Sequence, residues 1–116
     1  MVAIALLATL YTTLFLINMR KITKDAIRAF RNGNKFKRSN TEVRTFPHSS
    51  YRQLRLFGNV IAESDNGILS ITDAGYNTVT TKERLNGFPT VNIVQKDFQW
   101  FLNGEAWNGE YIEVDW

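Results

Sequence analysis

Basic side chains at helical spacing are the residues of this sequence with the clearest chemistry. Lys24, Arg28 and Arg31 are separated by four and three residues, so they share one face of a helix. Three more cations continue the basic run into the loop expected after that helix: Lys35, Lys37 and Arg38. Such a basic ridge is suited to contact nucleic-acid phosphates. The alternative is that these cations are only the solvated face of an amphipathic helix.

The charges of the chain are distributed unevenly along its length. Residues 20–55 contain eleven Lys or Arg and two carboxylates, a net charge of +9, although the whole chain carries only +3. Residues 56–116 contain three cations and nine carboxylates, a net charge of −6. This asymmetry indicates contact with nucleic acid or an acidic membrane surface. Alternatively, the two halves neutralise each other in the folded protein.

A second polar segment, residues 73–82, is rich in hydroxyl groups and precedes a short predicted helix. Helix N-termini carry free N–H groups that favour an anion such as phosphate. The candidate anion-binding residues are Thr80, Thr81, Lys82 and Arg84. The competing interpretation is that the threonines cap the helix and form a strand edge.

Few residues of this chain are suited to catalysis. There is no cysteine and only one histidine, His48, which lies in a proline-containing loop. Asp73, Glu83 and Asp97 fall at the ends of predicted elements, where acidic residues commonly cap helices and turns. The seven glycines are dispersed at turns instead of forming a phosphate loop. We therefore expect no catalytic residues, no metal site, no cofactor and no enzymatic activity.

The first eighteen residues differ from the rest of the chain. Residues 2–18 are uncharged and apolar, and at helical rise they span roughly 25 Å, the short end of what crosses a bilayer. Basic residues follow at once and would hold the C-terminal part in the cytoplasm, with residues 2–18 as its anchor in the inner membrane. Alternatively, a helix here is a buried core or oligomer contact. A further alternative is that Met19 is the true start and residues 1–18 are an upstream extension.

The remaining residues, 19–116, are expected to form one domain with a helix at its start. Thr23 is the predicted N-cap, and Ile22, Ala26, Ile27 and Phe30 share the apolar face. Gly33 is expected to end this helix. A second short helix is predicted over Thr81–Asn86, because Thr80 and Glu83 have the spacing of a capping box.

Short apolar runs separated by turn dipeptides predict strands in the rest of the domain. Gly58-Asn59, Asn66-Gly67, Asn103-Gly104 and Asn108-Gly109 are the expected turns. The predicted strands are Glu42–Phe46, Arg52–Phe57, Val60–Glu63, Ile68–Thr72, Thr90–Gln95, Phe98–Leu102, Glu105–Trp107 and Tyr111–Val114. Connections this short exclude parallel crossovers, so the fold class is α+β, with an antiparallel sheet of six to eight strands and helices on one side.

Aromatic residues are plentiful in the C-terminal third of the chain. Phe98, Trp100 and Leu102 alternate onto one face of a strand, and Phe101 takes the other. Most of these rings are expected in the core, since a domain this small depends on burying large side chains. An exposed sheet face would instead be a surface for a protein partner or for stacked bases.

Four segments of the sequence, SNTEV, LRLFGNVIAES, LSITDAGYNTVTTKERLNGF and WFLNGEAWNGEYIEV, resemble a family of small uncharacterised proteins encoded by tailed bacteriophages and prophages. The resemblance covers about Met19–Val114. It implies a phage protein at work in the cytoplasm of an infected bacterial cell, and it implies no activity. We therefore expect a non-enzymatic accessory protein whose basic ridge binds nucleic-acid phosphate. The alternative is a protein–protein interaction module, anchored at the inner membrane if residues 2–18 span it.

Overall fold

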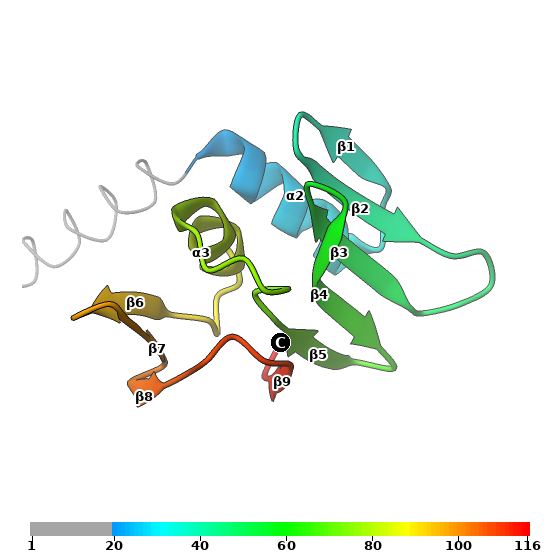
Figure 1. The fold of residues 1–116 in the computed structure, drawn as a ribbon. Coiled ribbons are helices and arrows are strands. Elements are labelled where there is room, and N and C mark those ends of the chain that lie inside the picture. Colours follow the sequence, from blue (N-terminus) through cyan, green and yellow to red (C-terminus); the bar gives the residue numbers. More distant parts are fainter. Residues whose placement is uncertain (1–19) are drawn as a thin grey trace, which may run out of the picture.

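The computed structural model describes residues 20–116, which fold into two helices and nine strands (Figure 1). The predicted apolar leader, residues 1–18, lies outside the described residues. The elements run in the order α2 (Lys21–Asn32), β1 (Phe36–Arg38), β2 (Thr41–Thr45), β3 (Arg52–Leu56), β4 (Asn59–Asp65), β5 (Ile68–Ile71), α3 (Val79–Leu85), β6 (Ile93–Lys96), β7 (Gln99–Leu102), β8 (Glu105–Ala106) and β9 (Ile112–Val114).

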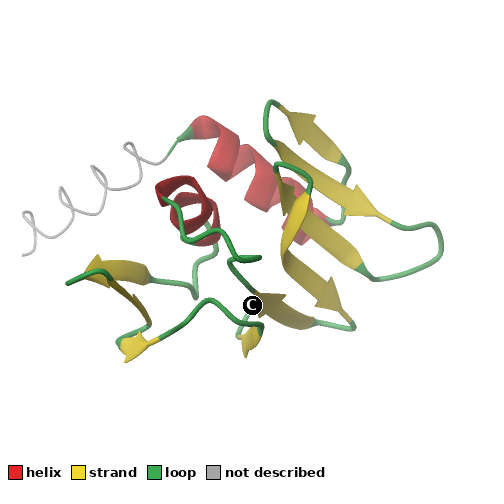
Figure 2. Ribbon diagram, in the orientation of Figure 1, coloured by secondary structure: helices red, strands yellow, loops and turns green. Residues whose placement is uncertain are grey.

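The strands form two separate antiparallel sheets, which confirms the α+β class and the antiparallel pairing. The larger sheet has six strands in the order β1-β2-β3-β4-β5-β9, and the smaller has the order β6-β7-β8. The smaller sheet lies at one end of the molecule, away from β1 (Figure 2). The prediction of a single sheet was wrong. The described residues also contain one strand more than the expected maximum, because β1 forms where a loop was expected.

The core lies between one face of the six-stranded sheet and the two helices. Ala26, Ile27 and Phe30 of α2 are buried against alternate residues of the sheet such as Val43 and Leu54. The segment after α3 joins the same core, because the Phe88 ring meets the Phe30 ring edge to face at 5.4 Å. The helices therefore pack against each other on one side of the sheet, as expected.

The α2 helix begins earlier than the sequence indicated. Its N-cap is Arg20, which makes no side-chain capping bond, so the prediction of Thr23 as the cap was wrong. Thr23 lies inside the helix, fully buried, and its hydroxyl donates to Glu83 of α3 at 3.0 Å. The other end is as predicted, since Gly33 has the left-handed conformation that ends the helix.

The α3 helix also begins before its predicted start, and its cap is a different threonine. Thr78 is the N-cap and its hydroxyl accepts a bond from the Thr81 N–H at 3.2 Å, so the capping box of Thr80 and Glu83 was wrong. The spacing rule misplaced the cap because Glu83 is used elsewhere. Its carboxylate accepts the Thr23 hydroxyl and pairs with Arg20 and Arg84.

Two hairpin turns differ from their predicted positions. The first turn is Phe57-Gly58, with φ of 50° and 80°, and Asn59 already pairs with Leu56. This register keeps Leu54 and Leu56 in the core and leaves Phe57 70% exposed. The turn before β7 includes Phe98, whose φ is 64° and whose side chain is 97% exposed, so it does not share the buried face of Trp100. Asn66-Gly67 and Asn103-Gly104 are turns as predicted.

The C-terminal segment joins the larger sheet through a contact at Gly109. Its carbonyl accepts hydrogen bonds from the Thr72 hydroxyl at 2.8 Å and the Asp73 N–H at 2.9 Å. Gly109 has a φ of 88°, and a Cβ atom there would collide with the Asp73 carboxylate. Only glycine fits this position, and it brings β9 beside β5.

Candidate functional site

The predicted cations of α2 line one wall of an open groove. Lys24, Ile27, Arg28 and Arg31 all face it, and they recur at the three- and four-residue spacing of a single stripe along the helix. The apolar side of the helix packs on the sheet, and Ile27 lies at the border between that side and the groove. Packing of that side therefore fixes the direction in which the three cations project.

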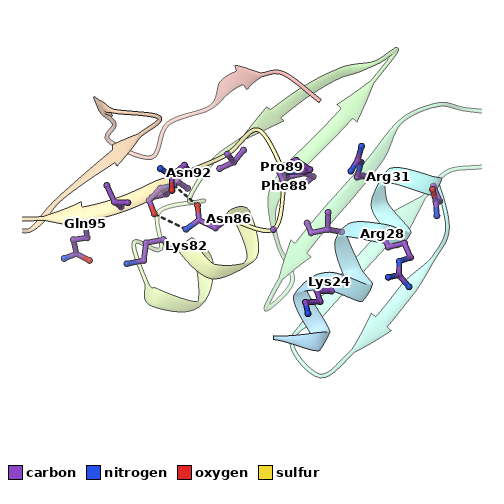
Figure 3. A pocket seen from close by; sticks show the side chains of 15 residues that line it. Lys24, Arg28, Arg31, Lys82, Asn86, Phe88, Pro89, Asn92 and Gln95 are labelled. Atoms are coloured by element: carbon purple, nitrogen blue, oxygen red, sulfur yellow. Dashed lines mark hydrogen bonds between the residues drawn. The ribbon is translucent and has the colours of Figure 1, made fainter. Parts of the chain in front are cut away.

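The other wall of the groove is formed by the last turn of α3 and the segment that follows it, up to β6. Lys82 and Asn86 belong to the end of that helix, Asn92 precedes β6, and Val94 and Gln95 lie on β6. Figure 3 shows the α2 cations on one side, with Lys82, Asn86, Asn92 and Gln95 on the other and Phe88 and Pro89 between. The groove has a volume of about 1120 Å³.

The groove is positively charged and has no acidic residue in its lining. Its fifteen lining residues include four cations, Lys24, Arg28, Arg31 and Lys82, and no Asp or Glu. Within residues 20–116 none of these four forms an ion pair. We call these four residues the groove cations. Their charge is available to an anionic ligand, and both walls contribute to it.

The other three predicted cations lie away from this groove. Lys37 and Arg38 are on strand β1 and not in a loop, and Lys35 immediately precedes that strand. Lys35 and Lys37 line a smaller hollow at the edge of the larger sheet, which also contains Glu42. The structure therefore divides the predicted ridge of six cations into two surfaces.

Arg38 is engaged by neighbouring groups. Its guanidinium donates to the Asp25 carboxylate at 2.8 Å and lies 5.0 Å from the centre of the Phe36 ring. Lys21 pairs with the same carboxylate at 2.9 Å, one helical turn away. Arg38 therefore links β1 to α2, which is a structural role.

This pairing predicts an acid-sensitive contact. The hydrogen bonds from Arg38 and then Lys21 lower the pKa of Asp25 from 3.8 to about 2. The pKa of Asp25 is lower in the folded protein than in the unfolded chain. The ionised Asp25 carboxylate therefore stabilises the fold fully above pH 3.8, and this stabilisation is lost as the pH falls through about 2. We expect Arg38→Ala to raise the pKa of Asp25 towards 3.8, measured by an NMR titration of its carboxyl carbon. An unchanged pKa would contradict the Arg38 contact.

Only one of the four predicted anion-binding residues lies in the groove. Lys82 is there, whereas Thr81 is buried and its hydroxyl lies 3.0 Å from that of Thr78. Thr80 is half-buried and is not part of the groove lining. Arg84 is 1% exposed and points into the protein. The four residues therefore do not form a common surface site.

Arg84 instead connects α2, α3 and the start of β2. Its guanidinium donates to the Thr23 hydroxyl at 2.9 Å, to the Thr41 hydroxyl at 3.0 Å and to the Asn40 side chain at 3.4 Å. Its charge is balanced by Glu83 at 3.1 Å. Burial lowers the pKa of Arg84, and the neighbouring Glu83 opposes that effect. Sequence spacing placed Arg84 beside Lys82, but the turn of the helix separates them.

The remaining polar candidates are apart from the groove. Asp73 is buried and its carboxylate accepts the Gly75 N–H at 2.7 Å, as expected of a turn residue. His48 is exposed in the loop between β2 and β3. Within residues 20–116, no three His, Asp or Glu side chains are grouped closely enough to hold a metal ion.

Sequence reasoning missed the amide side chains of the groove. Asn86 donates to the Ile93 carbonyl at 2.9 Å and accepts its N–H at 2.6 Å, so it covers part of the outer edge of β6. Asn92 and Gln95 are exposed beside it. Asparagine and glutamine are common in loops and at strand ends, so the sequence gives no signal for these residues. They become part of a site only because the fold brings β6 near α2.

The fold and the groove define a small α+β protein with a broad basic surface hollow. The chain belongs to a phage protein family, the Kyanoviridae Gp96 protein family, whose model matches residues 19–116. This confirms the phage resemblance. The searches of curated proteins and of solved structures found no match. Residues 1–18 lie outside the matched range, and neither helix of residues 20–116 is long and apolar enough to cross a membrane.

Proposed function

We propose that this protein binds nucleic acid and that the groove cations contact its phosphates. The observation that carries the proposal is the gathering of Lys24, Arg28, Arg31 and Lys82 around one groove whose lining holds no carboxylate. Phosphate contacts by Lys and Arg dominate the affinity of most proteins for nucleic acid. A groove open to solvent can accept a polymer that continues beyond both ends.

The pattern of ion pairs supports this proposal over general neutralisation of the two halves. Among the described residues, the ion pairs involve Arg20, Lys21, Arg38, Arg44 and Arg84, which are all outside the groove lining. The carboxylates that take part are Asp25, Glu42 and Glu83. These ion pairs therefore neutralise cations outside the groove lining, and the groove cations keep their positive charge.

The proposed activity is binding, with no catalytic step and no cofactor. Since the family is a phage family, we propose the cytoplasm of the infected bacterial cell as the place of action. Nucleic acids of both the phage and the host are present there. An anchor at the inner membrane would depend on residues 2–18.

Salt dependence is the direct test of this function. Four phosphate contacts predict that the logarithm of the binding constant falls with the logarithm of salt concentration with a slope of about −3 to −4. Fluorescence anisotropy of a labelled oligonucleotide, measured from low to physiological salt, gives this slope. Binding that is absent at low salt, or a slope near zero, would contradict the proposal.

One other surface favours the alternative of a protein partner. Phe57 and Tyr76 are exposed and line a hollow of about 320 Å³, and Val79 is 72% exposed nearby in sequence. Exposed aromatic side chains are common at protein–protein contacts. This surface shares no lining residue with the groove, so the salt titration distinguishes the two functions.

A further inference from the structure

We infer that the groove takes a single strand of nucleic acid, with its phosphates along α2 and its bases against the wall formed by residues 92–95. This inference rests on the proposed function and names the ligand of the same groove. It depends on the different chemistry of the two walls. The α2 wall is a line of three cations, and the other wall combines Lys82 with amides and apolar groups.

The α2 wall is suited to one sugar-phosphate backbone. Along the helix axis, Lys24 and Arg28 are about 6 Å apart and Arg28 and Arg31 about 4.5 Å, from the rise per residue. This row of cations can follow consecutive phosphates of one strand. A duplex presents its phosphates on a convex surface with its bases inside, so it would contact only the rim of a hollow.

The opposite wall offers groups that recognise unpaired bases. Asn92 and Gln95 are exposed, and within the described residues neither side-chain amide makes a hydrogen bond. Asn and Gln amides pair with base edges, which a single strand leaves accessible. Val94 also lines the groove and is 47% exposed, an apolar surface that a base can cover.

The groove floor sets the expected character of the binding. Phe88, the one aromatic residue of the lining, is 1% exposed and packs on Phe30, so it offers no stacking surface. Aromatic stacking supplies much of the affinity in many single-strand binders. Here phosphate contacts and amide contacts must carry the binding, which is therefore strongly dependent on salt.

The experiment compares one labelled 20-nucleotide DNA strand with its own duplex, using the full chain at constant salt. We expect the single strand to bind at least about tenfold more tightly. The N92A/Q95A variant is expected to weaken binding of the single strand about tenfold and to leave duplex binding unchanged. The matched control is N77A, which removes an exposed amide outside the groove lining. Thermal unfolding of each variant checks that it folds.

Each contrary result overturns the inference. Duplex binding as tight as single-strand binding would overturn it while leaving nucleic-acid binding by the groove intact. Equal effects of N77A and N92A/Q95A would also overturn it, because the amide wall would then have no specific part. If neither form of DNA bound at low salt, both this inference and the proposed function would fail.

Discussion

Reversing two of the groove cations, R28E/R31E, should weaken nucleic-acid binding by about 100-fold or more at physiological salt. The substitutions remove two phosphate contacts and place two negative charges on the wall that faces the strand. A loss of 100-fold corresponds to about 2.8 kcal/mol of binding free energy. Both residues are exposed on α2 and make no ion pair within residues 20–116, so the helix should keep its fold.

The control for this prediction is K35E/K37E, which makes the same change in net charge outside the groove. Lys35 and Lys37 are exposed at the edge of the larger sheet. Since neither lysine lines the groove and salt screens exposed charges, the control should lose no more than about threefold. Anisotropy measures both variants with the same oligonucleotide. If they lose equal affinity, then the overall charge of the protein and not the groove controls binding.

Replacing Arg84 with alanine should lower the free energy of unfolding by about 3 kcal/mol. The substitution leaves a cavity and removes every hydrogen bond that joins Arg84 to Thr23, Thr41 and Asn40. It also removes the closest cation from Glu83, whose side chain is 25% exposed and keeps Arg20 at 3.4 Å. This partial solvation places the expected loss at the lower end of the range for a broken buried pair.

Urea unfolding measures the effect, with R28A as the matched control. Arg28 is exposed on α2, so its substitution should change stability by no more than about 0.5 kcal/mol. R84K should recover little of the loss, because lysine lacks the planar fork that reaches several acceptors at once. An R84A variant as stable as the wild type would show that these contacts do not hold the helices together.

Local patterns predicted most of the secondary structure, and their failures have a common cause. Gly33 ended α2 as expected, and Asn66-Gly67 formed its hairpin, because these signals depend on the backbone of a few neighbouring residues. Thr23 and Thr80 fitted the rules for helix caps equally well. Yet the described structure uses Thr23 as a buried hydrogen-bond donor to α3, a role that depends on a residue sixty positions away.

The apolar pattern similarly left the number of sheets undetermined. Alternation marked the strands but did not indicate which of them pair. The strand β9 pairs with β5, and Gly109 is held beside the end of β5 by Thr72 and Asp73. The strand β1 was missed because Lys37 and Arg38 are polar. It forms because it pairs with β2 and because Arg38 binds Asp25.

The sequence by itself determined the α+β class, the basic face of α2 and the phage family, since all three depend on residue types and short spacings. Only the tertiary structure decided which cations act together. It joined Lys82 to Lys24, Arg28 and Arg31, and it placed Lys35 and Lys37 on another surface. It also paired Arg38 with Asp25 and buried Arg84. The physical reason is that a groove is made by two walls distant in sequence, and their separation is set by the packing of α3 against α2.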